Sequence, residues 1–263
     1  MSTAYAMRDS MTMLRRNLKH AQRYPSMTVS IVAMPVLMLL LFVFVFGGTL
    51  GAGINHSGGT NRSAYTNFVA PGIILMTVTA GAISTAVSVC TDMTEGIINR
   101  FRTMSIARSS VLTGHVIGNV IQTMISLVMV IAVALAIGFR PHGTFLGWLG
   151  ALGILALLAF ALSWISAAIG LGASSVEAAS NAPMPLTFLP FLGSAVVPPS
   201  SMPIGLRQFA EYQPFTPITD TLRALLMGTS VGNSAWISLA WGVGLSVLGF
   251  LWARSAFNRE AKI

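Results

Sequence analysis

Long stretches without a charged residue restrict what this chain can fold into more than any other feature of its sequence. From residue 25 to residue 61 there is no Asp, Glu, Lys or Arg, and residues 29–46 within that stretch are almost all apolar. A helix of this length is sufficient to cross a hydrocarbon layer about 30 Å thick. Charged residues make up only 8% of the chain, whereas soluble domains carry about 25%. The chain is therefore predicted to be an all-α integral membrane protein.

Six apolar stretches are predicted to cross the membrane as helices, within one transmembrane domain that covers residues 1–263. The fifth stretch carries Pro183, Pro185 and Pro190 and would reach only about 24 Å as a helix, which is short for a straight span. The six predicted spans are residues 29–46, 68–89, 111–137, 145–171, 182–197 and 235–253.

Two polar connections separate the later spans. Residues 174–181 contain Glu177 and are predicted to be a loop. Residues 198–233 begin with a cluster of prolines and are predicted to form an outer hairpin, either re-entrant or built of short helices at the outer membrane face. The two short helices are expected at residues 206–212 and from Thr216, as the N-cap residue, to the position before Gly228.

An amphipathic basic helix is predicted at residues 7–24, ahead of the first span. Its apolar residues recur at spacings of three and four, which places them on one helical face. Basic residues occupy another flank, so the helix is expected to lie in the membrane interface. The alternative is a disordered basic leader that only orients the first span. The basic residues are Arg8, Arg15, Arg16, Lys19 and Arg23.

The distribution of basic residues predicts the orientation. With six spans and the N-terminus inside, eleven of the fifteen Lys and Arg residues fall on the inner side. This bias follows the positive-inside rule, so both termini are expected in the cytoplasm of a multi-pass protein of the cell inner (plasma) membrane. The net charge of +8 is then explained by attraction to anionic lipid, and nucleic acid is not expected as a partner.

No acidic or basic residue lies in the middle of any predicted span. Ion-coupled carriers generally need such a group at membrane depth. The sequence also contains no catalytic motif and no phosphate-binding loop. A stand-alone carrier or channel and a membrane enzyme are therefore less favoured functions. His115, near the start of the third span, is expected to be hydrogen-bonded near the inner surface rather than part of a proton relay.

Polar residues inside the spans are few. Asn119, Gln122 and Ser126 are spaced by three and four residues, so they share one face of the third predicted span. They are candidates to line a transport pathway, and hydrogen bonding between helices explains them equally well. Cys90 is the only cysteine, and no metal site is predicted.

A charged segment, residues 91–104, separates the second and third predicted spans on the cytoplasmic side. As a helix it has Asp92 and Glu95 in its first turns and arginines in its last, an order that complements the helix dipole. Its apolar face can either rest on lipid or sit in a groove of a partner protein. The residues of that face are Ile97, Phe101 and Met104, with Ile98 beside them.

This segment carries a resemblance to a known family. Residues 95–104, Glu-Gly-Ile-Ile-Asn-Arg-Phe-Arg-Thr-Met, with residues 108–112 and Gly114, resemble the cytoplasmic loop of ABC-2 type permeases. The similarity is greatest to the daunorubicin-resistance branch of drug-efflux permeases. It extends over essentially the whole chain, including the basic N-terminal helix, the proline-rich fifth span and the short outer helices.

The resemblance implies the membrane subunit of an ATP-driven exporter of hydrophobic or amphipathic compounds, such as antibiotics or lipids. ATP and Mg would bind a separate ATP-binding subunit, normally in an assembly of two permeases, expected here as a homodimer, and two ATPases. Residues 91–108 would be the coupling loop, residues 7–24 would help to hold the ATPase, and residues 204–228 of the outer hairpin would form the external gate. The implied coupling residues are Glu95, Gly96, Ile97, Ile98, Asn99, Arg100, Phe101 and Arg102.

An alternative with the same fold is a permease for polysaccharide or lipid-linked glycan. An aromatic-lined channel would favour it, whereas the Met, Leu and Val residues of these spans favour an apolar cargo.

Overall fold

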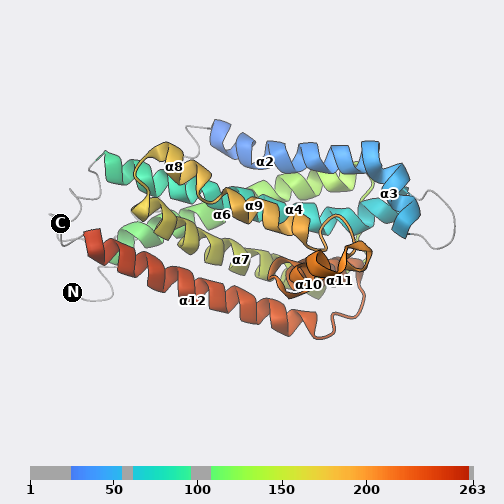
Figure 1. Cartoon of the computed structure of the whole chain (residues 1–263). Coiled ribbons are helices and arrows are strands. Elements are labelled where there is room, and N and C mark those ends of the chain that lie inside the picture. The colour runs from blue at the N-terminus through green and yellow to red at the C-terminus, as the bar shows by residue number, and fades with distance from the viewer. Residues whose placement is uncertain (1–24, 55–61, 96–107, 261–263) are drawn as a thin grey trace.

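The computed structural model describes residues 25–54, 62–95 and 108–260 (Figure 1). Within these ranges every regular element is a helix. The interfacial helix predicted at residues 7–24 lies outside the described residues, as does most of the loop predicted at residues 91–108.

Five helices are long and apolar enough to cross a membrane. The first is continuous but contains a π-helical section, and the second, α4, is central because it contacts the first, third and fourth. Helix α2 begins and α12 ends at the same end of the bundle (Figure 1). The helices are α2 (Pro25–Leu40) with η1 (Leu41–Phe46) and α3 (Gly47–Ile54), α4 (Arg62–Thr94), α6 (Arg108–Ala136), α7 (Phe145–Gly172) and α12 (Ser234–Glu260).

The π-helical section η1 is supported by an arginine from the next long helix. Arg62 Nε donates to the Val43 carbonyl over 3.1 Å, and Arg62 Nη2 donates to the Phe44 carbonyl over 3.2 Å. The Arg62 guanidinium also lies 4.8 Å from the centre of the Phe44 ring. These contacts provide polar partners at the point where the regular α-helical pattern is interrupted.

Residues 173–197, here called the broken segment, contain three short helical elements: α8 (Val176–Asn181), α9 (Met184–Phe188) and the 3₁₀ turn η2 (Leu189–Leu192). The fifth predicted span, residues 182–197, includes α9 and η2, whereas α8 precedes it. All three contact α4 (Figure 1). At one end the Cys90 Sγ atom lies 3.9 Å from the Ala173 carbonyl oxygen, and at the other Gly72 packs against Ala195. The segment therefore follows α4 along much of its length.

The prediction of a loop at residues 174–181 is wrong for residues 176–181, which form α8. Ser175 is the N-cap residue, and its hydroxyl accepts a hydrogen bond from Ala178 N over 3.1 Å. The polar composition that suggested a loop thus belongs to a short capped helix. Pro183 follows directly after its end and cannot continue the hydrogen-bonding pattern.

The outer hairpin contains η3 (Pro199–Ser201), α10 (Ile204–Tyr212) and α11 (Phe215–Met227). Both predicted short helices are confirmed, and Gly228 ends α11 with a φ of +71°. The prediction of Thr216 as the N-cap residue is wrong, because α11 begins at Phe215 and Pro214 is its N-cap residue. The Thr216 hydroxyl instead accepts a hydrogen bond from Ser194 N over 3.3 Å.

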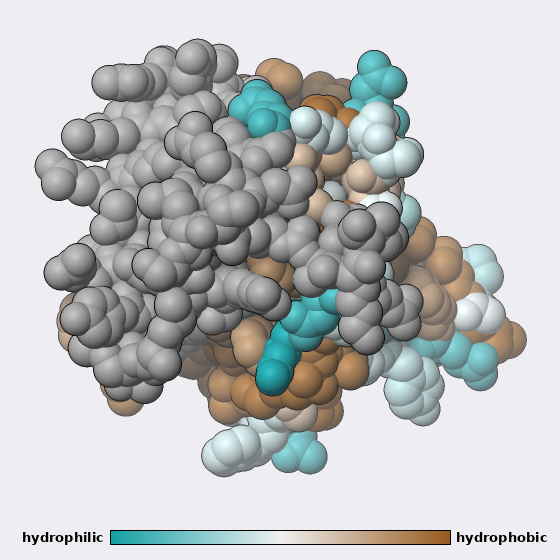
Figure 2. Space-filling view, turned by 90° about the vertical axis from the view of Figure 1, so that its left-hand side faces the viewer, coloured by the Kyte–Doolittle hydropathy of each residue, from teal (hydrophilic) through white to brown (hydrophobic). Residues whose placement is uncertain are grey.

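The outside of the bundle remains apolar. Trp236, Leu248 and Leu251 on α12 are each more than half exposed, as expected for side chains that face lipid. Figure 2 views the end at which α2 begins and α12 ends. Broad hydrophobic areas lie along the flanks there, with hydrophilic residues standing beside them (Figure 2).

Close backbone approach holds the broken segment against α4. A Cβ atom added to Gly72 would lie 2.5 Å from the Ala195 carbonyl oxygen and 2.6 Å from Ala195 Cα. Small residues allow such contacts between membrane helices, where packing rather than hydrophobic exclusion from water drives association.

We expect Gly72→Ala to destabilise the protein by about 1 to 3 kcal/mol, because the backbone of residue 195 cannot move aside without strain. The measurement is the midpoint of thermal unfolding of the purified protein in detergent. Gly153→Ala on α7 is the matched control, because a Cβ atom there meets nothing within 4 Å. Equal midpoints for the two variants would contradict this account.

Candidate functional site

A buried acid–histidine pair joins the two helices that flank the predicted coupling loop. Asp92 lies in the last turn of α4 and His115 lies near the start of α6. The distance from His115 Nε2 to Asp92 Oδ2 is 3.0 Å, and the two side chains are 8% and 9% exposed. The expected hydrogen bonding of His115 is confirmed. The pair fixes the separation of the helix ends between which residues 96–107 run.

The expected place of Asp92 in the first turn of a separate coupling helix is wrong. Helix α4 continues through Thr94, five residues past the predicted end of the second span. A carboxylate at this depth is tolerated because it has a polar partner. Glu95 follows at once and is exposed, with its backbone N donating to the Thr91 carbonyl over 2.9 Å. Gly96 to Arg102 and the five basic residues of the interfacial helix lie outside the described residues.

A second polar assembly links α4, α6 and α7 in the middle of the bundle. Asn119 Nδ2 donates to Ser163 Oγ over 2.8 Å, and Asn119 Oδ1 lies 2.7 Å from Ser84 Oγ. Ser163 Oγ in turn donates to the Ala159 carbonyl over 2.6 Å. Asn119 is therefore buried and hydrogen-bonded between helices.

The other two pathway candidates, Gln122 and Ser126, differ in burial. Ser126 is fully buried, and its Oγ atom has no hydrogen-bond partner within the described part of the chain. Gln122 is half-buried. None of the three candidates is among the residues that line the cavity described next.

An apolar cavity of about 450 Å³ lies between α2, α4 and the part of the broken segment that contains α9 and η2. Its walls include four methionines and two phenylalanines, and none of the described residues that line it is charged. Three side chains with hydroxyl groups, Thr79, Ser84 and Thr187, contribute the polar atoms of the side-chain lining. A cavity of this size and composition fits an apolar small molecule. The methionines and phenylalanines are Met34, Met38, Met76, Met184, Phe188 and Phe191.

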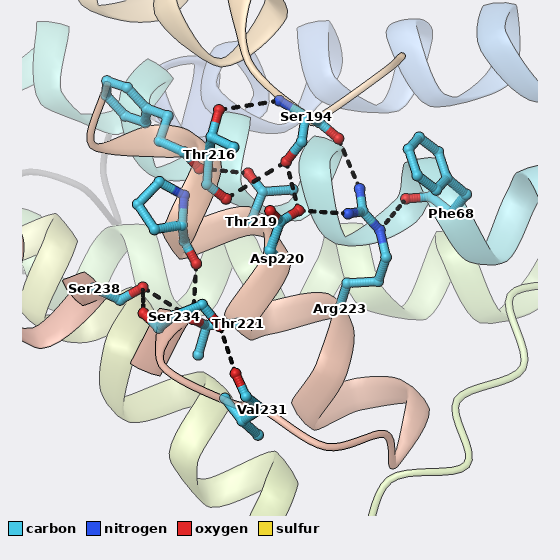
Figure 3. Close-up of polar contacts among 12 residues, drawn as sticks. Phe68, Ser194, Thr216, Thr219, Asp220, Thr221, Arg223, Val231, Ser234 and Ser238 are labelled. Atoms are coloured by element: carbon cyan, nitrogen blue, oxygen red, sulfur yellow. Dashed lines mark hydrogen bonds and ion pairs between the residues drawn. The ribbon is translucent and has the colours of Figure 1, made fainter. Parts of the chain in front are cut away.

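A third polar assembly, here called the outer clasp, consists of Phe68, Ser194, Thr216, Asp220 and Arg223 (Figure 3). Arg223 Nη2 donates to the Ser194 carbonyl over 2.7 Å, and Arg223 Nε donates to the Phe68 carbonyl over 3.2 Å. Its Nη1 donates to Asp220 Oδ1 over 2.8 Å, and its guanidinium lies 3.9 Å from the centre of the Phe68 ring. One arginine thus connects α11 to α4 and to the end of the broken segment.

The outer clasp supplies hydrogen bonds where the helical pattern is lost. Ser194 lies in the irregular stretch after η2, and its Oγ atom donates to Asp220 Oδ1 over 2.7 Å. The Val196 carbonyl lies 3.5 Å from the Tyr65 hydroxyl of α4. Irregular backbone at membrane depth needs such partners from the protein, because lipid provides none.

Opposing effects act on the pKa of Arg223, and the net shift is downward. Burial lowers the pKa of the guanidinium, while the charge of Asp220 and its hydrogen bond raise it. An arginine guanidinium is effectively always protonated in proteins, so the group keeps its charge. Helical spacing places Arg223 opposite the apolar stripe of α11, but that spacing carries no information about which segments meet this face.

Comparison with known proteins shows similarity to transporter permeases. The ABC-2 type transporter family matches residues 9–227. The daunorubicin resistance ABC transporter permease protein DrrB1 of Streptomyces coeruleorubidus is 30% identical over 260 residues, which are 98% of this chain and 89% of the relative. The probable doxorubicin resistance ABC transporter permease protein DrrC of Mycobacterium tuberculosis is 21% identical over 220 residues, 84% of this chain and 77% of the relative.

We expect Arg223→Met to lower the free energy of unfolding by about 2 to 3 kcal/mol, because hydrogen bonds from a charged donor to otherwise unpaired groups are lost. The matched control is Arg207→Met on α10, whose ion pair with Glu211 has side chains 50% and 44% exposed. That change is expected to stay within about 0.5 kcal/mol. Denaturation midpoints of both variants in detergent test the difference, and similar midpoints would refute a structural role of the outer clasp.

Proposed function

The chain belongs to the ABC-2 type transporter family, and we propose that it exports hydrophobic or amphipathic compounds with energy from a separate ATP-binding subunit. It is a multi-pass membrane protein and the permease subunit of an exporter. The observation that carries the proposed cargo class is the apolar cavity between α2, α4 and α9, whose lining in the described part of the chain contains no charged residue.

The cargo is proposed to be an antibiotic or a lipid-like molecule. The relatives are described by resistance to daunorubicin and doxorubicin. A volume of about 450 Å³ lies within the range of small-molecule sites, which is roughly 300 to 1,000 Å³. The methionine side chains of its wall can adapt to cargoes of different shape. A glycan cargo is disfavoured by the same apolar lining.

Six membrane passages are proposed, with α8, α9 and η2 forming the fifth. Along α4, Cys90 and Gly72 mark the two ends of the contact with residues 173–195. Eighteen helical positions between them correspond to about 27 Å, close to the thickness of the hydrocarbon layer. Six passages place both termini on one side, and the basic residues assign this side to the cytoplasm of the inner (plasma) membrane.

Energy is proposed to enter through residues 91–108. The chain has no phosphate-binding loop, so ATP and Mg would bind the partner subunit, of which two copies are expected. Residues 95–102 would seat in that partner, and residues 7–24 would help to hold it. The buried pair of Asp92 and His115 supports this proposal, because it ties α4 to α6 at the base of the loop.

A second copy of the chain is proposed to complete the pathway, and the outer hairpin is proposed to act as the external gate. The side of the bundle that carries the cavity exposes Met34, Leu37 and Phe188 by 55%, 59% and 59%. Apolar surface of this kind suits contact with another permease or with lipid. The outer clasp would hold the gate closed until the loop is displaced.

The test is ATP-dependent daunorubicin uptake by inverted vesicles that contain this chain and its partner ATPase. Glu95→Lys, Arg100→Glu and Phe101→Ala are each expected to reduce uptake to the level without ATP, because charge and apolar contact at the partner surface are lost. Membrane insertion should remain normal. His142→Ala, at an exposed position in the turn between α6 and α7, is the control.

Normal uptake in all three loop variants would refute the coupling role. Uptake by the purified chain without nucleotide or partner would establish a stand-alone carrier instead.

A further inference from the structure

The hydroxyl groups that line the apolar cavity all donate hydrogen bonds to acceptors within the protein. Thr79 Oγ1 donates to the Met76 carbonyl over 2.8 Å, and Thr187 Oγ1 donates to the Met184 carbonyl over 2.7 Å. Ser84 Oγ has two internal acceptors, the Gly81 carbonyl at 2.8 Å and Asn119 Oδ1 at 2.7 Å. A hydroxyl carries one proton, so each of these oxygens can offer an occupant only an acceptor.

The position of Ser84 is fixed by the polar assembly behind it. Asn119 is held by Ser163, and Ser163 is held by its own helix through the Ala159 carbonyl. Ser84 is half-buried, whereas Thr79 is only 1% exposed, so Ser84 is the more exposed of the two hydroxyl residues that α4 contributes to the cavity. Ser84 therefore connects the cavity to the buried interior of the bundle.

The rest of the lining also lacks donors. Methionine sulfur atoms are weak acceptors, and the ring faces of Phe188 and Phe191 carry negative partial charge. The remaining side chains are aliphatic, and the lining backbone N–H groups of α2 and α4 lie within helices. Among the described residues, the side chains of this cavity thus present acceptors without any donor.

We propose that the cavity selects lipophilic compounds that carry a hydrogen-bond donor, an N–H or O–H group, and that Ser84 Oγ accepts that bond. The inference rests on the proposed export function and assigns its cargo more narrowly. A donor on the cargo finds a partner at Ser84. A cargo whose only polar group is an acceptor finds no hydrogen-bond partner in the cavity, and the unpaired buried group lowers its affinity.

The experiment uses two fluorescent probes with nearly the same apolar body. N-phenyl-1-naphthylamine has a single N–H donor, and its N-methyl derivative has none. Binding of each probe is titrated on the complex of the full chain with its partner ATPase in lipid nanodiscs, with empty nanodiscs subtracted. ATP-dependent uptake of both probes and of daunorubicin is measured in inverted vesicles from the same cells.

Ser84→Ala is expected to weaken binding of N-phenyl-1-naphthylamine about 5-fold, the effect of one neutral hydrogen bond. Binding of the N-methyl probe should be unchanged, which also shows that the variant is folded. Ser84→Thr retains the acceptor and should restore binding of the donor probe. Ser88→Ala, one turn further along α4 and outside the cavity lining, is the matched control.

Equal affinity of the wild-type complex for the two probes would overturn the donor selection and leave the export function standing. An equal loss for both probes in Ser84→Ala would do the same. Absence of ATP-dependent uptake of daunorubicin and of both probes would instead overturn the proposed export function, and this inference with it.

Discussion

Backbone polar groups cannot be left without partners inside a membrane, and the irregular parts of this protein depend on that constraint. At two places where regular helical hydrogen bonding is interrupted, an arginine from another helix donates to backbone carbonyls. Arg62 does so at the π-helical section of the first helix, and Arg223 does so at the end of the broken segment. Two arginines are thus used as internal hydrogen-bond donors to carbonyl groups, in addition to their charge.

Each of the three polar assemblies includes a residue of helix α4. Near one end of α4, the Phe68 carbonyl accepts a hydrogen bond from Arg223 of the outer clasp. Ser84 lines the cavity, and Asp92 at the other end pairs with His115. Close contacts at Gly72 leave little space for the broken segment to shift independently of α4. In the proposed mechanism, force applied at the loop after Glu95 would therefore act on the cavity and on the outer clasp through one packed helix. Packed interfaces favour discrete rearrangements over gradual deformation.

Much of the fold follows from the sequence because hydropathy is a local property. Five of the six predicted spans have counterparts in helices long and apolar enough to cross a membrane, and the two short outer helices appear where helix signals placed them. Errors arose where a residue serves a tertiary contact. Thr216 has the composition of an N-cap residue but bonds to Ser194, and Asp92 resembles a residue of a surface helix but is buried against His115. Composition cannot distinguish these uses, because each residue type is suited to both.

The sequence by itself determined that this chain lies in a membrane and where its long helices run, and it predicted an external energy source. Those conclusions need only the apolar length of each segment and the absence of ionisable groups and phosphate-binding motifs. The tertiary structure alone decided that segments distant in sequence enclose an apolar cavity and that Arg223 joins three of them. It also decided that the cavity hydroxyls donate to acceptors within the protein, because the direction of a hydrogen bond depends on the neighbouring groups.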